Sequence, residues 1–233
     1  EEHSMVTYGN MHRGVFLKRP NRFRTLVDLA GRVERCHVPN TGRLGELLVP
    51  GTEVWCQFHP APARKTAWSL VTVNRGGKLV NIDSQAPNRL AQDWLEKGSL
   101  GPVEDVRREQ RFGEARFELR VMREGKPWFL EVKGVTLESG GVARFPDAPT
   151  ARGTKHLQCL QAALARGYGA AVLFLVQLSG VTRLEPNWAA DPAFARELLR
   201  AAEAGVAVRA AACRVRVDGI SVAGTVPVSL AAP

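Results

Sequence analysis

Residues 116–133 read RFELRVMREGKPWFLEVK, two segments of alternating character joined by a Gly- and Pro-containing turn. The apolar residues at alternate positions are Phe117, Leu119, Val121, Trp128, Leu130 and Val132. A period of two is typical of a β-strand with one buried face, and residues 124–127 (EGKP) are typical of a turn. The stretch therefore predicts a β-hairpin with one apolar face.

Three charged residues fall together on the opposite face of this predicted hairpin. Glu118 faces the strand that carries Glu131, and Lys133 follows two residues later on the same face. Two facing carboxylates repel unless a cation neutralises them, and Mg²⁺ or Mn²⁺ takes such oxygen ligands and bridges to phosphate. The pattern predicts a metal site for phosphodiester hydrolysis with Glu118, Glu131 and Lys133 as catalytic residues. Glu109 is a candidate third metal ligand beside Glu118 and Glu131.

A simpler interpretation is a solvated hairpin face. Glu118 would then pair with Arg116 or Arg120, and Glu131 with Lys133, as ordinary surface ion pairs. An E-x-K triplet alone does not separate the two interpretations, because it occurs by chance in many proteins.

The chain before the hairpin has a different character up to about residue 80. Short apolar runs separated by Gly, Pro and Asn turns predict a small all-β unit, as in oligonucleotide-binding (OB) barrels, although strand count alone does not exclude other small barrels. Basic residues are frequent in and beside the turns. They are Lys18, Arg19, Arg22, Arg24, Arg32, Arg35, Arg43, Arg64 and Lys65.

After residue 80 predicted helices alternate with strands. Residues 88–97 and 192–204 have helical spacing, Thr154 is a candidate N-cap for a helix through Leu164, and residues 170–176 and 206–217 are strand-like. We therefore expect an α/β protein with two domains, residues 1–80 and residues 81–233.

The predicted helix near residue 154 begins in a basic segment. Arg152, Lys155 and His156 surround its N-terminus, where free N–H groups and the helix dipole favour a phosphate. A capped helix with solvated basic residues is the alternative.

The composition agrees with an anionic partner. Lys and Arg number 32 against 23 Asp and Glu, which gives a formal net charge of +9 and a pI of about 9.9. The four cysteines are widely spaced and are expected to be reduced. No run approaches the ~20 apolar residues of a membrane span, so no membrane association and a cytoplasmic location are expected.

Four motifs give the chain a resemblance to the sugar fermentation stimulation protein A family. They are residues 19–23 (RPNRF), 37–43 (HVPNTGR), 131–137 (EVKGVTL) and 145–157 (FPDAPTARGTKHL). The resemblance extends from about Met11 to residue 206 and beyond, and implies an OB-type barrel joined to a domain similar to PD-(D/E)XK nucleases. It also implies DNA binding and regulation of sugar metabolism genes.

The resemblance implies roles for individual residues. Glu131 and Lys133 take the E-x-K positions, Glu118 that of the preceding acid and Glu109 that of an acid near the start of the domain. The implied phosphate contacts are Arg22, Arg43, Arg64, Lys65, Arg152, Lys155 and His156. One departure concerns Glu118, because the family usually has Ser-Arg-x-Asp where this chain has Ala115-Arg116-Phe117-Glu118. The carboxylate is thus one methylene further from its backbone.

Three functions remain open at the level of sequence. The first is an Mg²⁺- or Mn²⁺-dependent nuclease acting on DNA or RNA, with DNA the favoured partner, and the second is a DNA-binding regulator with a silent nuclease fold. The third, an enzyme for a phosphorylated sugar, is disfavoured because the basic residues are spread over both halves of the chain. The oligomeric state is open, with a homodimer among the alternatives.

Overall fold

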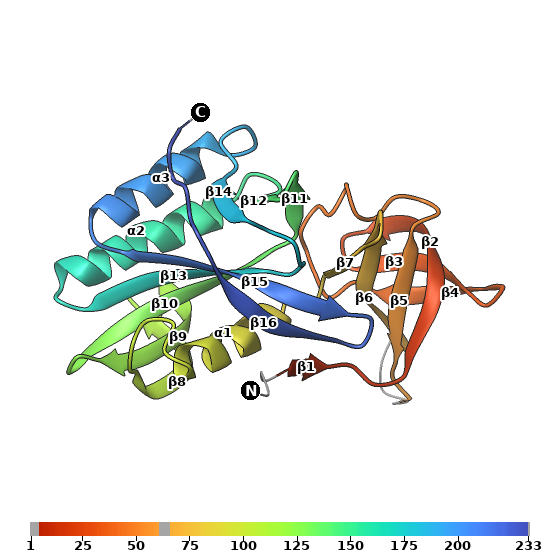
Figure 1. Ribbon diagram of the computed structural model, residues 1–233, viewed down its shortest axis with the longest axis horizontal. Coiled ribbons are helices and arrows are strands. Elements are labelled where there is room, and N and C mark those ends of the chain that lie inside the picture. Colours follow the sequence, from red (N-terminus) through yellow and green to blue (C-terminus); the bar gives the residue numbers. More distant parts are fainter. Residues whose placement is uncertain (1–4, 61–65, 233) are drawn as a thin grey trace.

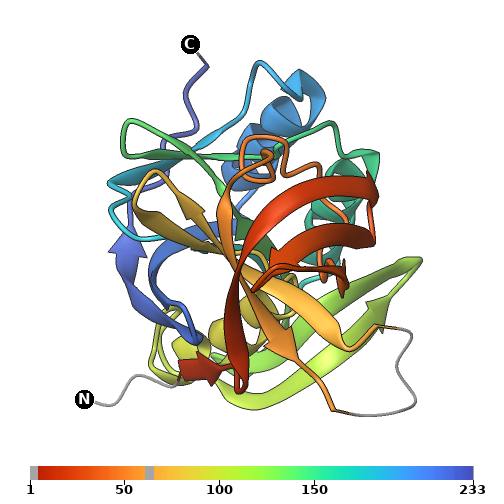
Figure 2. The ribbon, with the colours of Figure 1, turned by 90° about the vertical axis from the view of Figure 1, so that its right-hand side faces the viewer.

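Strands from Met11 to Asn81 wind into a small barrel in the computed structural model, which describes residues 5–60 and 66–232. The strands are β2 (Met11–Asn21), β3 (Arg24–Leu29), β4 (Arg32–His37), β5 (Glu53–Phe58), β6 (Trp68–Arg75) and β7 (Lys78–Asn81). Their order is β4-β3-β2-β5-β6-β7, and a further pairing of β4 with β6 closes the barrel (Figure 2). The predicted OB-type barrel is confirmed.

The barrel interior is filled by alternate residues of its strands. Val27, Cys36 and Val54 are fully buried, whereas their neighbours in sequence are more exposed. This alternation has the period of two that is expected of β-strands with one buried face, as predicted from the sequence for the short apolar runs.

The second unit is a mixed sheet with the order β1-β16-β15-β13-β10-β9-β8. Its strands are β1 (Met5–Thr7), β8 (Glu104–Phe112), β9 (Ala115–Arg123), β10 (Lys126–Val135), β13 (Gly169–Val176), β15 (Ala207–Arg216) and β16 (Gly219–Val226). A small sheet beside it contains β11 (Leu137–Ser139), β12 (Val142–Phe145) and β14 (Arg183–Pro186). The predicted α/β class is confirmed.

Helices cover both faces of the large sheet. Helix α1 (Ala86–Glu96) lies on one face, and α2 (Ala151–Ala165) and α3 (Pro192–Glu203) pack together on the other (Figure 1). Every residue of the central parallel strand β13 is therefore buried. No helix in the described part of the chain is both long and apolar enough to cross a membrane.

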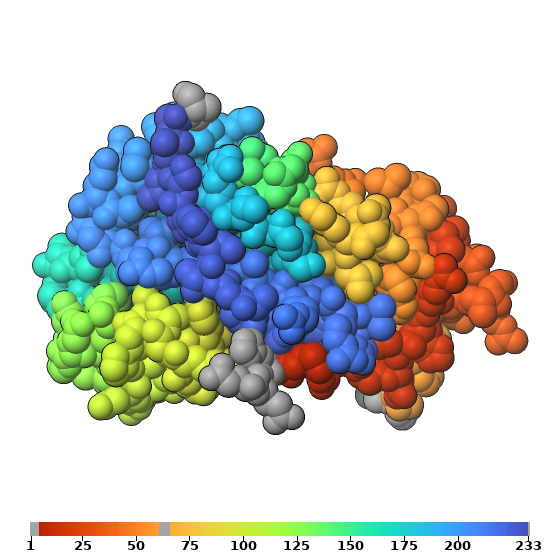
Figure 3. Space-filling view, viewed as in Figure 1, coloured from red at the N-terminus to blue at the C-terminus, as the bar shows by residue number. Residues whose placement is uncertain are grey.

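The first strand joins the second unit. Residues 1–80 were assigned to the barrel domain from the sequence, but β1 pairs antiparallel with β16, with Val6 opposite Ile220. The first described strand thus lies in the large sheet, the chain then enters the barrel, and the two units share a continuous surface (Figure 3).

Buried hydrogen bonds fix the junction between the units. The Tyr8 hydroxyl donates to Asp83 Oδ2 (3.0 Å) and accepts from Asn81 Nδ2 (3.1 Å). Gln177 Nε2, at the end of β13, donates to Asn81 Oδ1 (3.0 Å). Because burial and the nearby Asp83 raise the pKa of Tyr8, its hydroxyl stays protonated and keeps its donor role.

Candidate active site

The β9–β10 hairpin brings the two predicted carboxylates to neighbouring positions. Its pairing ends at Leu119 opposite Leu130, and Glu118 and Glu131 are the next residues on their strands beyond that pair. The two side chains are close enough that the charge of Glu131 acts on the titration of Glu118.

The face that carries Glu131 is buried, which corrects the prediction of a hairpin with one apolar and one polar face. Phe129 is 7% exposed and Glu131 only 2%, and the Phe129 ring packs on Phe117 and Tyr168. The physical reason is that the sheet lies between α1 on one face and α2 on the other. The alternative of a solvated surface pair at Glu131 is therefore wrong.

Two basic side chains surround one oxygen of Glu131. Lys133 Nζ lies 2.5 Å from Oε1, and His156 Nδ1 from helix α2 lies 2.7 Å from the same oxygen, without hydrogen-bond geometry. The other oxygen, Oε2, is buried and has no hydrogen-bond partner among the residues that the structure describes. Burial raises the pKa of Glu131, but His156 and Lys133 outweigh it, so the net shift is downward and the carboxylate is ionised at neutral pH.

Glu118 has a different environment because it reaches toward α1. Asn88 Nδ2 donates to Glu118 Oε2 at 2.7 Å. Burial raises the pKa of Glu118, and the charge of Glu131 raises it further, although Lys133 and Arg152 oppose the shift. The two carboxylates thus have opposite pKa shifts, a pattern typical of functional sites.

Asn88 is a site residue that the sequence analysis missed. Its helix approaches β10 closely at Gly134, where a Cβ atom would overlap Pro87 of α1 and the side chain of Gln177. Asn88 and Glu118 line a cavity of about 290 Å³. Its other lining residues are Gln85, Arg89, Arg108 and Glu109. Nothing in the local sequence around Asn88, at the start of a predicted helix, indicates that its side chain forms a hydrogen bond with Glu118.

Glu109 also lines this cavity, but its carboxylate forms an ion pair with Arg116 and not with the partners of Glu118 or Glu131. Its φ of 53° is in the left-handed region, and its side chain is 64% exposed. Among the described residues no group of three or more His, Cys, Asp and Glu side chains is arranged to hold a metal ion. The structure thus brings together Glu118, Glu131 and Lys133, with Glu109 further out.

Helix α2 places its three basic residues in three different environments. Arg152 is exposed, Lys155 is exposed and pairs with Glu114 (2.9 Å), and His156 is buried against Glu131. His156 therefore belongs to the carboxylate site and not to a surface phosphate site. The helix is capped by Thr150, whose Oγ1 accepts from Gly153 N (3.0 Å), so the prediction of Thr154 as N-cap was wrong.

The barrel candidates Arg22 and Arg43 are exposed and lie near the half-buried Arg19. Arg64 and Lys65 lie outside the described residues. Arg19 Nη2 donates to Arg22 O (2.7 Å) and Asn40 O (2.9 Å). Its Nη1 donates to Gly42 O (2.9 Å) and Arg43 O (2.8 Å). One guanidinium thus holds the β2–β3 turn against the loop after β4.

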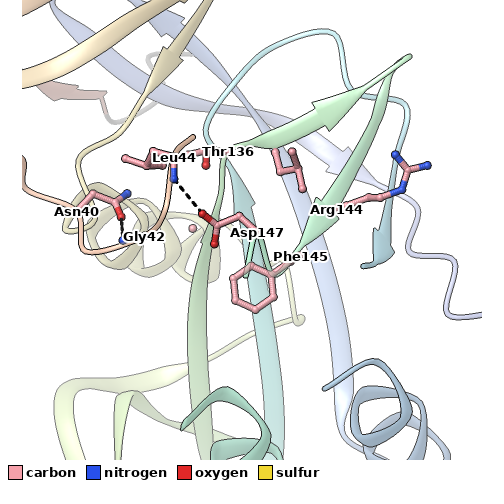
Figure 4. Close-up of a pocket in the computed structure, with 9 residues that line it drawn as sticks. Asn40, Gly42, Leu44, Thr136, Arg144, Phe145 and Asp147 are labelled. Atoms are coloured by element: carbon pink, nitrogen blue, oxygen red, sulfur yellow. Dashed lines mark hydrogen bonds between the residues drawn. The ribbon is translucent and has the colours of Figure 1, made fainter. Parts of the chain in front are cut away.

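That loop also contacts the second unit. Asp147 Oδ2, in the segment before α2, accepts from Arg43 N (3.1 Å) and from Leu44 N (3.3 Å). Figure 4 shows the hydrogen bond from Leu44. Asn40, Thr136 and Asp147 line a cavity of about 130 Å³ at this contact. Two of the sequence motifs, residues 37–43 and 145–157, therefore meet across the junction.

Comparisons with known proteins agree on one family. A model described as "SfsA N-terminal OB domain" matches residues 17–82, and one described as "Sugar fermentation stimulation protein RE domain" matches residues 85–219. Sugar fermentation stimulation protein homologs of Desulfitobacterium hafniense and Clostridium tetani are 44% and 42% identical over 225 and 230 residues. The alignments cover 97% of this chain in both cases, and 99% and 100% of the relatives.

A solved structure is similar over the same length. It is described as "The structure of Pyrococcus Furiosus SfsA in complex with Ca2+", is 31% identical and superposes with a TM-score of 0.88. The match covers 96% of this chain and 98% of that one. With both units matched in order, the chain belongs to the sugar fermentation stimulation protein A family.

Proposed function

We propose that the protein is a metal-dependent phosphodiesterase acting on nucleic acid. The observation that carries the proposal is the buried carboxylate of Glu131, with Lys133 at one oxygen and no hydrogen-bond partner for the other within residues 5–60 and 66–232. A buried polar atom without a partner costs free energy of about 1–3 kcal/mol, so its retention calls for a ligand.

The donor set fits a hard divalent cation. Glu118 and Glu131 would hold Mg²⁺ or Mn²⁺ through carboxylate oxygens, and Glu109 could join them on leaving Arg116. The bound cation would supply Lewis acidity toward a phosphate oxygen. The family member from Pyrococcus furiosus described with Ca²⁺ supports a divalent cation in this fold.

The protein's own groups would orient the reactants. Lys133 keeps an ammonium beside Glu131 and can stabilise negative charge that develops on the phosphate. His156 and Asn88 each contact one carboxylate from a helix and fix its position. Arg152 is exposed, and its terminal guanidinium N–H groups would contact an adjacent phosphate while Nε donates to His156 Nε2 (3.5 Å).

Nucleic acid is the proposed substrate because of the barrel and the charge. OB barrels bind oligonucleotides on their sheet and loops, and the net charge of +9 favours a polyanion. Arg22 and Arg43 are exposed on the barrel side of the junction. DNA and a cytoplasmic location are part of the same proposal.

Cleavage of labelled single- and double-stranded DNA and RNA with Mn²⁺ or Mg²⁺ tests this function. We expect Glu131→Gln and Lys133→Met to lower the rate at least about 100-fold, as removal of one charge-stabilising group does in other enzymes. Glu203→Gln, an exposed substitution at the end of α3, is the matched control and should leave the rate unchanged. Equal rates for wild type and Glu131→Gln would assign the cleavage to a contaminant and reject the proposal.

A second candidate is a DNA-binding regulator without turnover. It is favoured by the ion pairing in the site, because Lys133 already pairs with Glu131 and Arg116 already pairs with Glu109. This candidate predicts DNA binding in which the logarithm of the binding constant falls linearly with the logarithm of the salt concentration. It also predicts no cleavage with any divalent cation.

A further inference from the structure

The turn between β2 and β3 exposes an aromatic ring. Phe23 is 51% exposed, and it is the one aromatic residue among the exposed large hydrophobic side chains of the described chain. Single exposed apolar side chains are common, so exposure alone does not indicate a function.

The backbone that carries this ring is held firmly. Phe23 N donates to Asn21 Oδ1 (2.9 Å), and Phe23 O accepts from Val38 N (2.9 Å). The preceding carbonyl, Arg22 O, accepts from the Arg19 guanidinium at 2.7 Å. A ring on a backbone already fixed in this way loses little conformational entropy when a ligand packs against it.

The surroundings of the ring are basic. Arg22 and Arg24 flank Phe23 and are exposed. Arg43 is also exposed, and its carbonyl accepts from the same Arg19 guanidinium that binds Arg22 O. An aromatic face among arginines complements a chain of bases and phosphates, and no other common partner offers both along its length.

The turn is also linked to the carboxylate site through a short series of contacts. Arg43 N donates to Asp147 Oδ2, and Asp147 precedes helix α2, which carries Arg152 and His156. His156 reaches Glu131. Exposed arginines therefore occur at both ends of this connection, at the turn and at the start of α2.

We infer that Phe23 is a base-stacking residue and that the substrate bound here is single-stranded nucleic acid. A base in a single strand can stack on the ring, whereas bases in a duplex are stacked on one another and have no free face. The inference rests on the proposed nucleic-acid function, but it concerns binding and does not require cleavage.

Binding of a fluorescein-labelled 20-nucleotide mixed-sequence strand, as DNA and as RNA, tests the inference. Fluorescence anisotropy at fixed salt with EDTA separates binding from cleavage. We expect Phe23→Ala to weaken binding about 5- to 150-fold, the range that corresponds to 1–3 kcal/mol for one stacked base. Phe23→Trp should bind like wild type, whereas Phe23→Leu, which is apolar but has no π face, should lose most of the affinity.

Two controls test whether the effect is specific to the Phe23 ring and to single strands. Val33→Ala removes another exposed apolar side chain of the barrel (61% exposed) and should bind within twofold of wild type. A 20-base-pair duplex should bind Phe23→Ala and wild type equally. Wild-type binding by Phe23→Ala or Phe23→Leu, an equal loss for the duplex, or no binding of any strand by wild type would each overturn the inference.

Two further outcomes are diagnostic. Sedimentation that shows a wild-type dimer converted to a monomer by Phe23→Ala would assign the ring to a self-association surface and reject base stacking. Conversely, stacking-dependent binding without cleavage by any divalent cation would reject the proposed phosphodiesterase and leave the binding inference intact.

Discussion

Lys133→Met tests the buried charge at the centre of the candidate site without relying on activity. The substitution keeps the apolar stem of the side chain and removes the ammonium that lies 2.5 Å from Glu131 Oε1. The side chains of Lys133 and Glu131 are only 17% and 3% exposed, so water cannot replace the lost partner. Glu131 would remain as a buried carboxylate with incomplete compensation.

The expected loss of stability is about 3 kcal/mol at pH 7.5 in EDTA. Removal of one partner of a buried pair costs about 3–5 kcal/mol, and we take the lower end because His156 still lies 2.7 Å from the same oxygen. For a chain of this length such a loss lowers Tm by roughly 6–12 °C. Lys97→Met is the matched control, since Lys97 pairs with Asp93 but is 45% exposed and should cost at most about 0.5 kcal/mol.

The pH dependence gives a second readout. Lys133 lowers the pKa of Glu131, so its removal raises that pKa and the ionised carboxylate then disfavours folding. This penalty is present at neutral pH and declines as pH falls through the raised pKa toward the ordinary 4.5. Urea unfolding should therefore show a smaller difference between Lys133→Met and wild type at pH 5 than at pH 7.5.

Divalent cations should reverse the defect if the site binds them. A cation present at 100 times its dissociation constant stabilises the folded state by about 2.7 kcal/mol, and the uncompensated carboxylate favours a cation more strongly than the paired one does. Mn²⁺ should thus raise the Tm of Lys133→Met more than that of wild type. A loss below about 0.5 kcal/mol in EDTA would refute the reasoning, because it would mean that Glu131 is hydrated or neutral in the folded protein.

Three other substitutions have defined outcomes. Because burial raises the pKa of Glu118, its contribution to stability is present below pH 4.5 and is lost as pH rises through the raised value. Glu118→Gln, which can still accept from Asn88, should stabilise the metal-free protein by about 0.5 kcal/mol at pH 8 and have no effect near pH 4, as measured by thermal unfolding. Thr150→Ala should cost about 1 kcal/mol in urea unfolding because it removes the N-cap of α2, whereas an equal cost for Thr154→Ala would contradict the capping assignment. Arg19→Lys should cost about 1–3 kcal/mol, since an ammonium cannot serve four carbonyls with the geometry of a planar fork, and an unchanged urea midpoint would contradict that function.

Local periodicity was enough to predict the hairpin and the approximate position of Glu118 opposite the strand that carries Glu131. The alternation around Leu119 and Leu130 excludes a slip by one residue, because such a slip would exchange the two faces. It was not enough to predict that the second face is buried, since the helices that cover it come from residues 86–96 and 151–165. Phe129 was the available signal, an aromatic residue at a position assigned to the polar face.

The burial of His156 could also have been predicted from the helical spacing of the sequence. A helix that buries Leu157 and Leu160 buries the residue before Leu157 as well, since positions i, i+1 and i+4 share one face. The basic character of Arg152 and Lys155 drew attention to phosphate contact instead. By contrast, the contact of Asn88 with Glu118 joins α1 to β9 across 30 residues, and no local pattern encodes it.

The motif around Arg19 illustrates a different limit. Arg22 and Arg43 stood out as charges, but the structure has Arg19 at the centre, with hydrogen bonds to both of their carbonyls. Burial lowers the pKa of Arg19, yet a guanidinium remains charged at any physiological pH. A sequence reveals that an arginine is present and not whether it binds the backbone or a ligand.

The opposite pKa shifts of the two carboxylates explain why the site would accept a cation at Glu118 despite its longer side chain. Glu131 already pairs with Lys133, so ionisation of Glu118 adds a negative charge that burial and the charge of Glu131 disfavour. Either a proton or a metal ion can relieve this, and the two compete for the same carboxylate. The extra methylene lets Glu118 reach Asn88 on α1, so the position of its carboxylate is set by that amide as well as by β9. Cation affinity should therefore rise with pH as Glu118 loses its proton, and it should depend on Asn88 as much as on the length of the acid.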